Sequence, residues 1–258
     1  MLKRISAQLS VLRQKKPLVL CLTNYVTMDF MANSLLALGA LPLMSHTEEE
    51  LLELITISHA IYLNLGTLDR SFITRCQQAI VLAKKLKKPI ILDPVGAGAS
   101  SLRTSTARLF MKDASIVRGN ASEISALIEE NVLTHGVEST RSTLSAIDSA
   151  NQLARQLNNT IVISGKDDYI TDGFRCETIS YGSPLMPLVT GMGCTLTAVV
   201  AAFHAVQADA FDAAAAATTF FGFCGNQAEK MAYAPGSFRT HFIDALYTLT
   251  LNENDHAQ

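Results

Sequence analysis

The stretch VTGMGCTLT, residues 189–197, combines residue types that can bind an anion. Gly191 and Gly193 allow backbone torsions that other residues avoid, and they let the main chain approach a ligand closely. Their N–H groups, with those of Cys194 and Thr195, would lie at a helix N-terminus, where partial positive charge favours an anion. The spacing matches neither the Walker pattern nor the dinucleotide-binding pattern. The stretch therefore predicts an anion hole beside a thiol, with an ordinary glycine turn as the alternative.

Two acidic residues are placed to hold a metal ion near such a hole. Asp93 follows the apolar run at 90–92, and Glu123 lies three residues after Asn120. Carboxylates that flank a phosphate site suit hydrated Mg²⁺, which takes one or two carboxylates together with phosphate oxygens. The alternative is structural, because Asp93 before proline can be a turn residue and Glu123 can cap a helix together with Asn120. Glu123 can fill both roles.

One basic residue and one cysteine complete the candidate chemistry. Arg118 follows a predicted buried strand, so its guanidinium would emerge beside the other loops, where phosphate is a natural partner; a surface ion pair is the alternative. Cys194 can equally be a small buried residue, because free cysteine usually is. We expect Cys21, Cys76 and Cys224 to lie in the core. Five cysteines without a C-x-x-C pair favour neither a disulfide framework nor a structural zinc site.

The elements that must position these residues alternate between short apolar runs and longer segments of helical period, the pattern of βα units around a mostly parallel sheet. Candidate strands are 18–22, 41–44, 60–63, 90–92, 115–117 and 160–163, with a hairpin of 169–170 and 175–180 around Asp172-Gly173. Candidate helices are 27–38, 48–55, 70–86, 101–111, 121–129, 143–156, 194–206, 209–231 and 237–247. Because ligands gather outside the carboxyl ends of parallel strands, the loops after these strands should form the site.

Composition narrows the functional classes. The chain has 258 residues, of which 48% are hydrophobic and 17% charged, so we expect one globular domain over residues 1–258. The formal charge of −2 leaves no excess of Lys or Arg for a nucleic-acid backbone. The N-terminal apolar run at 18–22 is too short for a signal peptide or a membrane span. These features favour a cytoplasmic protein with a small-molecule substrate, and they favour neither a nucleic-acid partner nor a membrane partner.

Six stretches taken together resemble the hydroxyethylthiazole kinases of the ribokinase-like superfamily. They follow the family's order between Thr23 and Phe203, and they read TNYVTMDFMANSLLALGALPLMSHTEEE, NLGTLD, KKPIILDPVGAGAS, SIVRGNASEISAL, VISGKDDYITDG and VTGMGCTLTAVVAAF. The resemblance implies a three-layer α/β ribokinase-like fold with a mostly parallel central sheet flanked by helices. It also implies a kinase that transfers the γ-phosphoryl group of ATP, with Mg²⁺, to the hydroxyl of 4-methyl-5-(2-hydroxyethyl)thiazole, a step of thiamine salvage.

The resemblance also implies roles for individual residues. Contacts to the thiazole substrate would come from Met44, Asn24, Gly66, Val95 and Gly191. ATP would be bound by Arg118, Ser164 and Asn120, and Mg²⁺ by Asp93 and Glu123. Cys194 stands at the position of the catalytic base, and the N–H groups of Gly191 and Gly193 would stabilise the migrating phosphoryl group.

Two departures from the family's pattern concern these same loops. Residues 43–45 read Leu-Met-Ser where Val-Met-Ala is common, and residues 164–166 read Ser-Gly-Lys where Thr-Gly-Glu is common. The second departure bears on affinity for the nucleotide. The resemblance further implies a homotrimer with the substrate site at the subunit boundary.

A thiol in the position of the base requires a physical account. A helix N-terminus lowers the pKa of cysteine below its usual 8.5, so we expect appreciable thiolate near neutral pH, although bound ATP opposes this. The alternatives are a kinase for another small alcohol, such as a hydroxymethylpyrimidine or pyridoxal, a non-catalytic nucleotide or thiazole sensor, and a transferase with Cys194 as covalent nucleophile. No activating histidine stands near Cys194 in the sequence, which disfavours the last of these.

Overall fold

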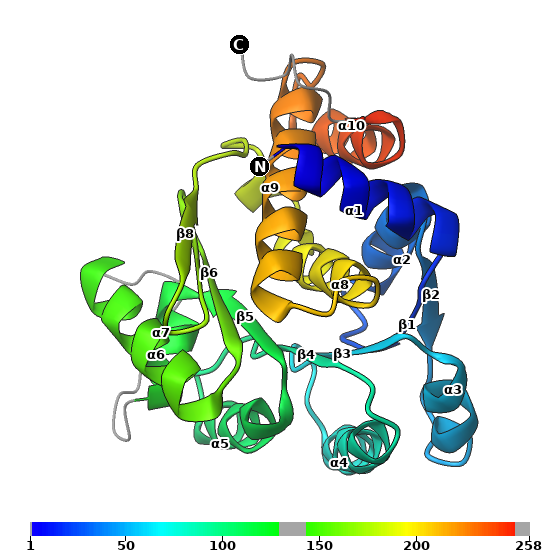
Figure 1. The fold of residues 1–258 in the computed structure, drawn as a ribbon, viewed down its shortest axis with the longest axis vertical. Coiled ribbons are helices and arrows are strands. Elements are labelled where there is room, and N and C mark those ends of the chain that lie inside the picture. Colours follow the sequence, from blue (N-terminus) through cyan, green and yellow to red (C-terminus); the bar gives the residue numbers. More distant parts are fainter. Residues whose placement is uncertain (1, 129–142, 251–258) are drawn as a thin grey trace.

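A computed structural model describes residues 2–128 and 143–250, and these form one α/β unit around a single sheet (Figure 1). The eight strands of the described residues run in the order β2-β1-β3-β4-β5-β6-β7-β8. Strands β1 to β6 pair in parallel, and β7 and β8 close one edge as an antiparallel hairpin. The strand bounds are β1 Leu18–Leu22, β2 Leu41–Met44, β3 Ala60–Asn64, β4 Ile90–Asp93, β5 Ile116–Asn120, β6 Thr160–Ser164, β7 Asp168–Thr171 and β8 Cys176–Ile179.

Helices cover both faces of the sheet and make the three layers that the sequence predicts (Figure 1). One face carries α1 Leu2–Lys15, α2 Met28–Leu38, α8 Met192–His204, α9 Ala210–Glu229 and α10 Pro235–Thr248. The other face carries α3 Leu51–Ile57, α4 Arg70–Lys85, α5 Ser101–Phe110, α6 Ala121–Ile128 and α7 Thr143–Leu157. Short 3-10 turns lie at Met111–Asp113 and Met186–Leu188. The helix expected at 121–129 ends at residue 129, which lies outside the described residues.

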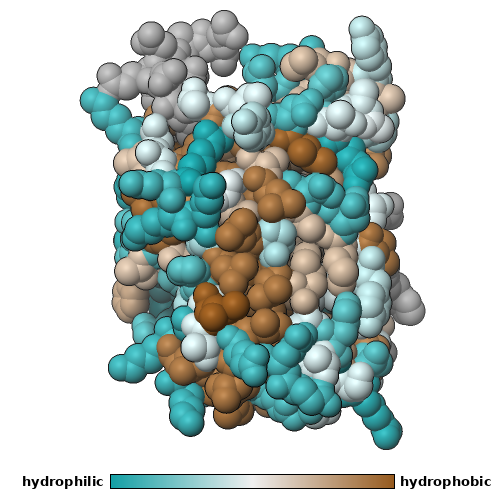
Figure 2. All heavy atoms as spheres, turned by 90° about the vertical axis from the view of Figure 1, so that its right-hand side faces the viewer, coloured by the Kyte–Doolittle hydropathy of each residue, from teal (hydrophilic) through white to brown (hydrophobic). Residues whose placement is uncertain are grey.

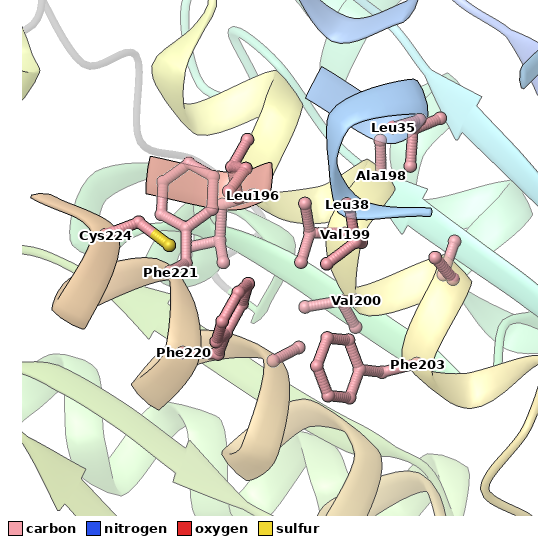
Figure 3. Close-up of a cluster of buried hydrophobic side chains, with 14 of the residues drawn as sticks. Leu35, Leu38, Leu196, Ala198, Val199, Val200, Phe203, Phe220, Phe221 and Cys224 are labelled. Atoms are coloured by element: carbon pink, nitrogen blue, oxygen red, sulfur yellow. The ribbon is translucent and has the colours of Figure 1, made fainter. Parts of the chain in front are cut away.

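Alternation along each strand divides the buried side chains between the two layers. In β1, Val19 and Cys21 belong to the cluster under α8 and α9, whereas Leu20 and Leu22 belong to the cluster under α3 and α4. This division follows from the two-residue period of a strand. Figure 3 shows part of the first cluster, where apolar side chains of α8 and α9 meet those of α2. In the sequence, α8 is almost wholly apolar because it lies between the sheet and the outer helices.

Helix α1 is absent from the sequence-based predictions, and the structure corrects them. Its stretch LKRISAQLSVLRQK is polar overall, but Leu2, Ile5, Leu9 and Leu12 recur at helical spacing and are all buried. Near its end, Arg13 donates hydrogen bonds to main-chain carbonyls of α2 and of the segment that ends α10. The helix is amphipathic, and its apolar stripe packs from outside onto α8 and α9.

The hairpin at the far edge of the sheet turns at the residues that the sequence indicates. The carboxylate of Asp172 accepts hydrogen bonds from the N–H groups of Phe174 and Arg175, and Gly173 has a φ of 87°. Arg175 also contacts Asp209 through both carboxylate oxygens, at 3.1 and 2.9 Å, so the hairpin is tied to the start of α9.

The opposite edge of the sheet is formed by β2, which within residues 2–128 and 143–250 pairs only with β1. The N–H of Leu41 donates to the carbonyl of Pro17 on the β1 side, at 2.9 Å. Since successive residues of a strand point their N–H groups to opposite sides, Pro42 faces the open edge. Proline has no N–H to present there. Among the described residues, no helix is long and apolar enough to cross a membrane.

Candidate active site

The carboxyl ends of β1, β3 and β4 meet the N-terminus of α8, and their polar side chains form one connected group. The amide Nδ2 of Asn24 lies 2.8 Å from Asn64 Oδ1 and 3.6 Å from Cys194 Sγ. The amide Nδ2 of Asn64 in turn lies 3.1 Å from Asp93 Oδ2. The structure thus brings together Asn24, Asp93 and Cys194, which the sequence places far apart, through the buried side chain of Asn64.

Asp93 ends β4 and is 1% exposed, yet it is well supplied with donors. Thr197 Oγ1 reaches its Oδ2 at 2.9 Å, and Tyr62 Oη lies 3.3 Å from the same oxygen. Burial raises the pKa of Asp93 to about 6; the positive charge of Arg118 opposes this rise and the negative charge of Glu123 adds to it. The carboxylate is therefore ionised at neutral pH, and Oδ1 is the oxygen that these donors and Asn64 leave unused.

Glu123 does cap a helix, as the structural alternative expected. Its Oε2 accepts from the N–H of Asn120 at 2.8 Å, and Asn120 Oδ1 accepts from the N–H of Glu123 at 2.9 Å. Its Oε1 accepts from the N–H of Gly96 at 2.8 Å, which ties the loop after β4 to the start of α6. Each of these oxygens keeps a second lone pair, so the cap leaves room for a metal-bound water.

The donor set at this edge fits Mg²⁺ better than a softer metal. The described residues contain no group of three or more His, Cys, Asp or Glu side chains that could hold a metal by themselves. Asp93 and Glu123 each offer hard oxygen ligands. Burial is the main cause of the raised pKa of Asp93, and the negative charge of Glu123 adds to it. A bound dication would offset the repulsion between the two carboxylates. Mg²⁺ commonly takes one or two carboxylates and completes its shell with water and phosphate oxygens.

Arg118 crosses from β5 to the first turn of α8. Its Nε donates to Ser164 Oγ at 2.6 Å, and its guanidinium lies so close to Gly193 that a Cβ there would approach Nη1 to 2.7 Å. A guanidinium held beside free helix N–H groups is suited to a phosphate. The sequence-predicted pair of Arg118 and Ser164 is therefore in contact, and Gly193 is needed because of a close approach.

The two glycines of the anion-hole stretch serve different ends. Gly191 caps α8 with a φ of 91°, in the left-handed region, and a Cβ there would lie 3.0 Å from Thr27 Cβ. Gly193 has no such torsion and is small because of Arg118. The N–H groups of Gly193 and Cys194 belong to the first turn, where a helix offers its N–H groups no acceptor of its own. These donors would be available to an anion, and the anion hole stays a prediction.

The expectation of a lowered thiol pKa at Cys194 is wrong. Burial, and secondly the charge of Asp93, raise the pKa of Cys194 to about 11, and Asn64, Thr27 and Arg118 only partly offset this. The helix N-terminus is outweighed because the thiol is largely withdrawn from water beside a carboxylate. In the unliganded protein, Cys194 is thus a neutral thiol at neutral pH.

A cavity of about 740 Å³ opens beside Arg118 and has two chemically distinct ends. Arg118, Asn120, Ser164 and Lys166 make a polar end at the carboxyl ends of β5 and β6, and two carboxylates, Asp167 and Asp168, line the cavity beside them. The opposite walls are apolar and come from the connection before α8 and from α8 and α9, with Tyr181, Met186, Pro187, Met192, Leu196, Phe221 and Gly222. A cavity of this size and division suits a ligand with an anionic end and a flat apolar end.

The residues expected on the substrate side lie on the other flank of α8. Met44 ends β2 at the outer edge and is half-buried. Gly66 is packed so tightly that a Cβ would lie 2.9 Å from both Asn24 Cβ and Asn64 Oδ1. The carbonyl of Val95 accepts from Arg103 Nη1 at 2.9 Å, and the carbonyl of Gly66 accepts from Nη2 of the same arginine.

Sequence reasoning missed four residues that organise this edge. They are Tyr62, Asn64, Arg103 and Thr197. Asn64 had a usable signal, because a polar amide directly after the apolar run at 60–63 stands at the expected edge. The others had none, since their partners are set by strand register and helix packing.

The profile of the hydroxyethylthiazole kinase family matches residues 9–252. The chain belongs to this family. A hydroxyethylthiazole kinase of Chlamydia felis is 45% identical over 249 residues, which cover 96% of this chain and 95% of that protein. One of Desulfotalea psychrophila is also 45% identical, over 94% of this chain and 89% of its own length.

Solved structures agree with the family assignment. The hydroxyethylthiazole kinase protein of Pyrococcus horikoshii superimposes with a TM-score of 0.89 at 38% identity, covering 96% of this chain and 94% of its own. A pyridoxal kinase of Bacillus subtilis has a TM-score of 0.59 at 16% identity, which shows a shared fold alone. The expected family, ribokinase-like fold and kinase class are therefore confirmed.

Proposed function

We propose that this hydroxyethylthiazole kinase family member phosphorylates the hydroxyl of 4-methyl-5-(2-hydroxyethyl)thiazole with ATP, a step of thiamine salvage in the cytoplasm. The observation that carries the proposal is the meeting of Asp93, Arg118 and Cys194 around the first turn of α8, beside the 740 Å³ cavity. Relatives that are 45% identical over almost the whole chain bear the name of this kinase.

ATP would lie in the cavity with its phosphates toward α8. Arg118, fixed by Ser164, is the cation that faces the free N–H groups of Gly193 and Cys194. Asn120 lines the same polar end, and the apolar walls suit the adenine ring. Because phosphoryl transfer passes through a loose transition state, these fixed donors would stabilise charge without having to reorganise.

Mg²⁺ would be held by Asp93 and, through water, by Glu123. When bound, the ion would neutralise negative charge on the phosphates of ATP. The role of Asp93 follows from its unused Oδ1 and its ionised state at neutral pH. Glu123 would keep its helix cap and contribute by its charge and its position in the first turn of α6, directly after β5.

Cys194 would accept the proton of the substrate hydroxyl. Its thiol has a pKa of about 11 in the free protein, and the charge of Asp93 is the second cause of this rise. A cation at Asp93 would offset that second cause, whereas burial, the first cause, would remain. Only the thiolate form of Cys194 can accept the proton, and because a loose transition state needs little proton removal before the phosphoryl group moves, a small thiolate fraction would be enough.

The thiazole would bind between the loops after β1, β2, β3 and β4, with Gly191 near the hydroxyl that is to be phosphorylated. Asn24, Gly66 and Val95 stand on these loops, and Met44 stands at the outer edge. We further propose a homotrimer that completes this side of the site. Its support is the apolar character of the molecular face around β2, with exposed Leu36, Leu41, Leu52 and Ile57, and Figure 2 shows apolar side chains gathered on this face.

The test is release of ADP by the purified protein with Mg-ATP and hydroxyethylthiazole, beside hydroxymethylpyrimidine, pyridoxal and ribose as control acceptors. We expect turnover with the thiazole and at most traces with the others. Preferred turnover of another alcohol would refute the substrate but leave the phosphate chemistry in place. Tight binding of ATP and thiazole without ADP release would favour a sensor.

A further inference from the structure

Asn64 has its whole hydrogen-bonding capacity engaged inside the protein. It ends β3, opposite Asp93 in the register of β3 and β4, and it is 0% exposed. Its Nδ2 lies 2.7 Å from Tyr62 Oη and 3.1 Å from Asp93 Oδ2. Its Oδ1 accepts from Gly66 N at 2.9 Å and from Asn24 Nδ2 at 2.8 Å. Two donor hydrogens and two acceptor sites are therefore all matched.

Main-chain donors fix the direction of both amides. The N–H of Gly66 can only donate, so Asn64 must turn its oxygen toward it and its NH₂ toward Asp93. The N–H groups of Val26 and Thr27 likewise require Asn24 Oδ1, at 3.0 and 3.1 Å. The NH₂ of Asn24 is thereby directed at Asn64 Oδ1 and at Cys194 Sγ. Neither amide can flip without leaving a buried donor unpaired.

The result is a continuous set of hydrogen bonds between the sulfur of Cys194 and the carboxylate of Asp93: the NH₂ of Asn24 donates to the sulfur and to Asn64 Oδ1, and the NH₂ of Asn64 donates to Asp93. Tyr62 runs beside it, because its hydroxyl accepts from Asn64 and has the carbonyl of Cys194 within 3.0 Å. Asn64 is the member that touches both branches. Its donor end meets the carboxylate, and its acceptor end holds the amide that faces the thiol.

We propose that Asn64 is a positioning residue for phosphoryl transfer, which sets the distance and orientation of Asp93 relative to Cys194 without touching substrate or ATP. The proposal rests on the proposed function, since it needs Asp93 and Cys194 as working groups. Its energetic basis is that both groups act through geometry, and a misplacement of about 1 Å lowers a rate by about 10²-fold. The effect should thus fall on kcat and spare nucleotide binding, which belongs to Arg118 and Ser164.

Two substitutions separate the polarity of Asn64 from its size. Asn64→Asp keeps the shape and the acceptor for Gly66 and Asn24 but replaces the donor that faces Asp93. Asn64→Ala removes both ends. The matched control is Asn159→Ala, because Asn159 is also a buried asparagine, at 6% exposure, and its amide bonds only the carbonyls of Met111 and Ala114.

We expect both Asn64 variants to lower kcat by about 10²-fold while the ATP dissociation constant, measured by calorimetry, and KM for ATP stay within about threefold. Asn159→Ala should lower the thermal midpoint without changing kcat. A wild-type kcat in either Asn64 variant would overturn the proposal. If both variants lost ATP binding and also lost a cooperative unfolding transition, the proposal would be overturned as well, because Asn64 would then be a folding determinant.

A crystal structure of Asn64→Ala tests the proposal independently of the acceptor alcohol. We expect the Asn24 amide to turn away so that its 3.6 Å contact with Cys194 is lost. An unchanged Asn24 and Asp93 would refute the positioning role. Failure of the thiazole as acceptor in the wild type would instead refute the proposed function, and the kcat comparison would then be made with the alcohol that is turned over.

Discussion

At the scale of single residues, burial in the same site leaves Asp93 charged and Cys194 neutral at neutral pH. Burial raises the pKa of Asp93 to about 6 and that of Cys194 to about 11. The carboxylate still ionises at neutral pH because its ordinary pKa is low, whereas the thiol remains protonated. Of these two groups, only Asp93 therefore carries a negative charge at neutral pH, at the place where the phosphates of ATP would approach.

Replacing Cys194 tests its role as base. We expect Cys194→Ala to lower kcat by about 10²- to 10⁴-fold, the usual contribution of general base catalysis. Cys194→Asp should stay active, because a carboxylate there can accept a proton. The measurement is steady-state ADP release with Mg-ATP and the thiazole. Near-wild-type turnover of Cys194→Ala would show that the thiol takes no proton, and intact-mass analysis during turnover would detect a covalently modified Cys194.

Replacing Asp93 should separate stability from activity. A folded-state pKa of about 6 lies above the ordinary value of 3.8 for aspartate, so the folded protein binds this proton more tightly than the unfolded chain. The stabilising contribution is complete below about pH 4 and is lost as the pH rises through 6. Asp93→Asn has no such loss, and we expect it to raise the free energy of unfolding at pH 8 by up to about 3 kcal/mol in EDTA.

The same variant should be inactive, since an amide is a poor ligand for Mg²⁺. Urea unfolding at pH 8 and pH 4 checks the stability, with wild type as the reference at each pH. Equal stabilities of wild type and Asp93→Asn at pH 8 would contradict the raised pKa of Asp93. Retained turnover would contradict its role toward the metal.

At the scale of elements, two glycines of α9, Gly222 and Gly225, form a notch in the helix surface, and the segment before α8 packs into this notch. A Cβ on Gly222 would lie 2.6 Å from Tyr181 Cβ and 2.8 Å from its carbonyl oxygen. One turn later, a Cβ on Gly225 would lie 2.7 Å from Met186 Sδ. These contacts hold the connection at 181–187 against the helix, where it forms a wall of the cavity together with Gly222 itself.

Filling this notch should weaken ATP binding specifically. Gly222→Ala forces the main chain of Tyr181 away from α9, which costs about 1–3 kcal/mol and shifts the wall. We expect KM for ATP to rise about tenfold while KM for the thiazole changes little. The control is Gly236→Ala, where nothing lies within 4 Å and no effect on KM is expected. An unchanged KM for ATP in Gly222→Ala would place the nucleotide elsewhere.

Elements were far easier to predict from the sequence than the contacts among them. Apolar runs found the strands from β1 to β6, and glycine with aspartate located the hairpin turn, because these signals are local. The polar appearance of α1 hid its buried stripe. The pairing of Asn64 with Asp93 depends on strand register, and the raised pKa of Cys194 depends on burial. Neither property can be predicted from the residues adjacent to these positions in the sequence.

At the scale of the whole molecule, the two edges of the sheet differ. The β7–β8 hairpin edge is tied to α9 by Arg175, and the β2 edge stands beside the apolar face of Figure 2. Met44, the expected thiazole contact, belongs to this second edge. Assembly and substrate binding would then depend on the same surface.

A charge placed on this face should dissociate the proposed trimer. Leu41 is 42% exposed on β2, and Leu41→Lys would bury a lysine if another subunit covers it. We expect light scattering to show monomers and KM for the thiazole to rise about tenfold or more. Val81→Lys is the control, because Val81 is 67% exposed on α4, which packs on the other side of the sheet. A monomeric wild type would refute the trimer outright.

Pro42 sets how the β2 edge can meet other chains. With no N–H at this outward position, the edge lacks a donor that a further strand would need to extend the sheet. A strand of a neighbouring copy would therefore find one main-chain donor fewer along this edge, which disfavours a continuous ladder. An apolar face at a sheet edge is a common start of aggregation. Here the proline leaves the apolar side chains available for packing while weakening the edge as a template for further strands.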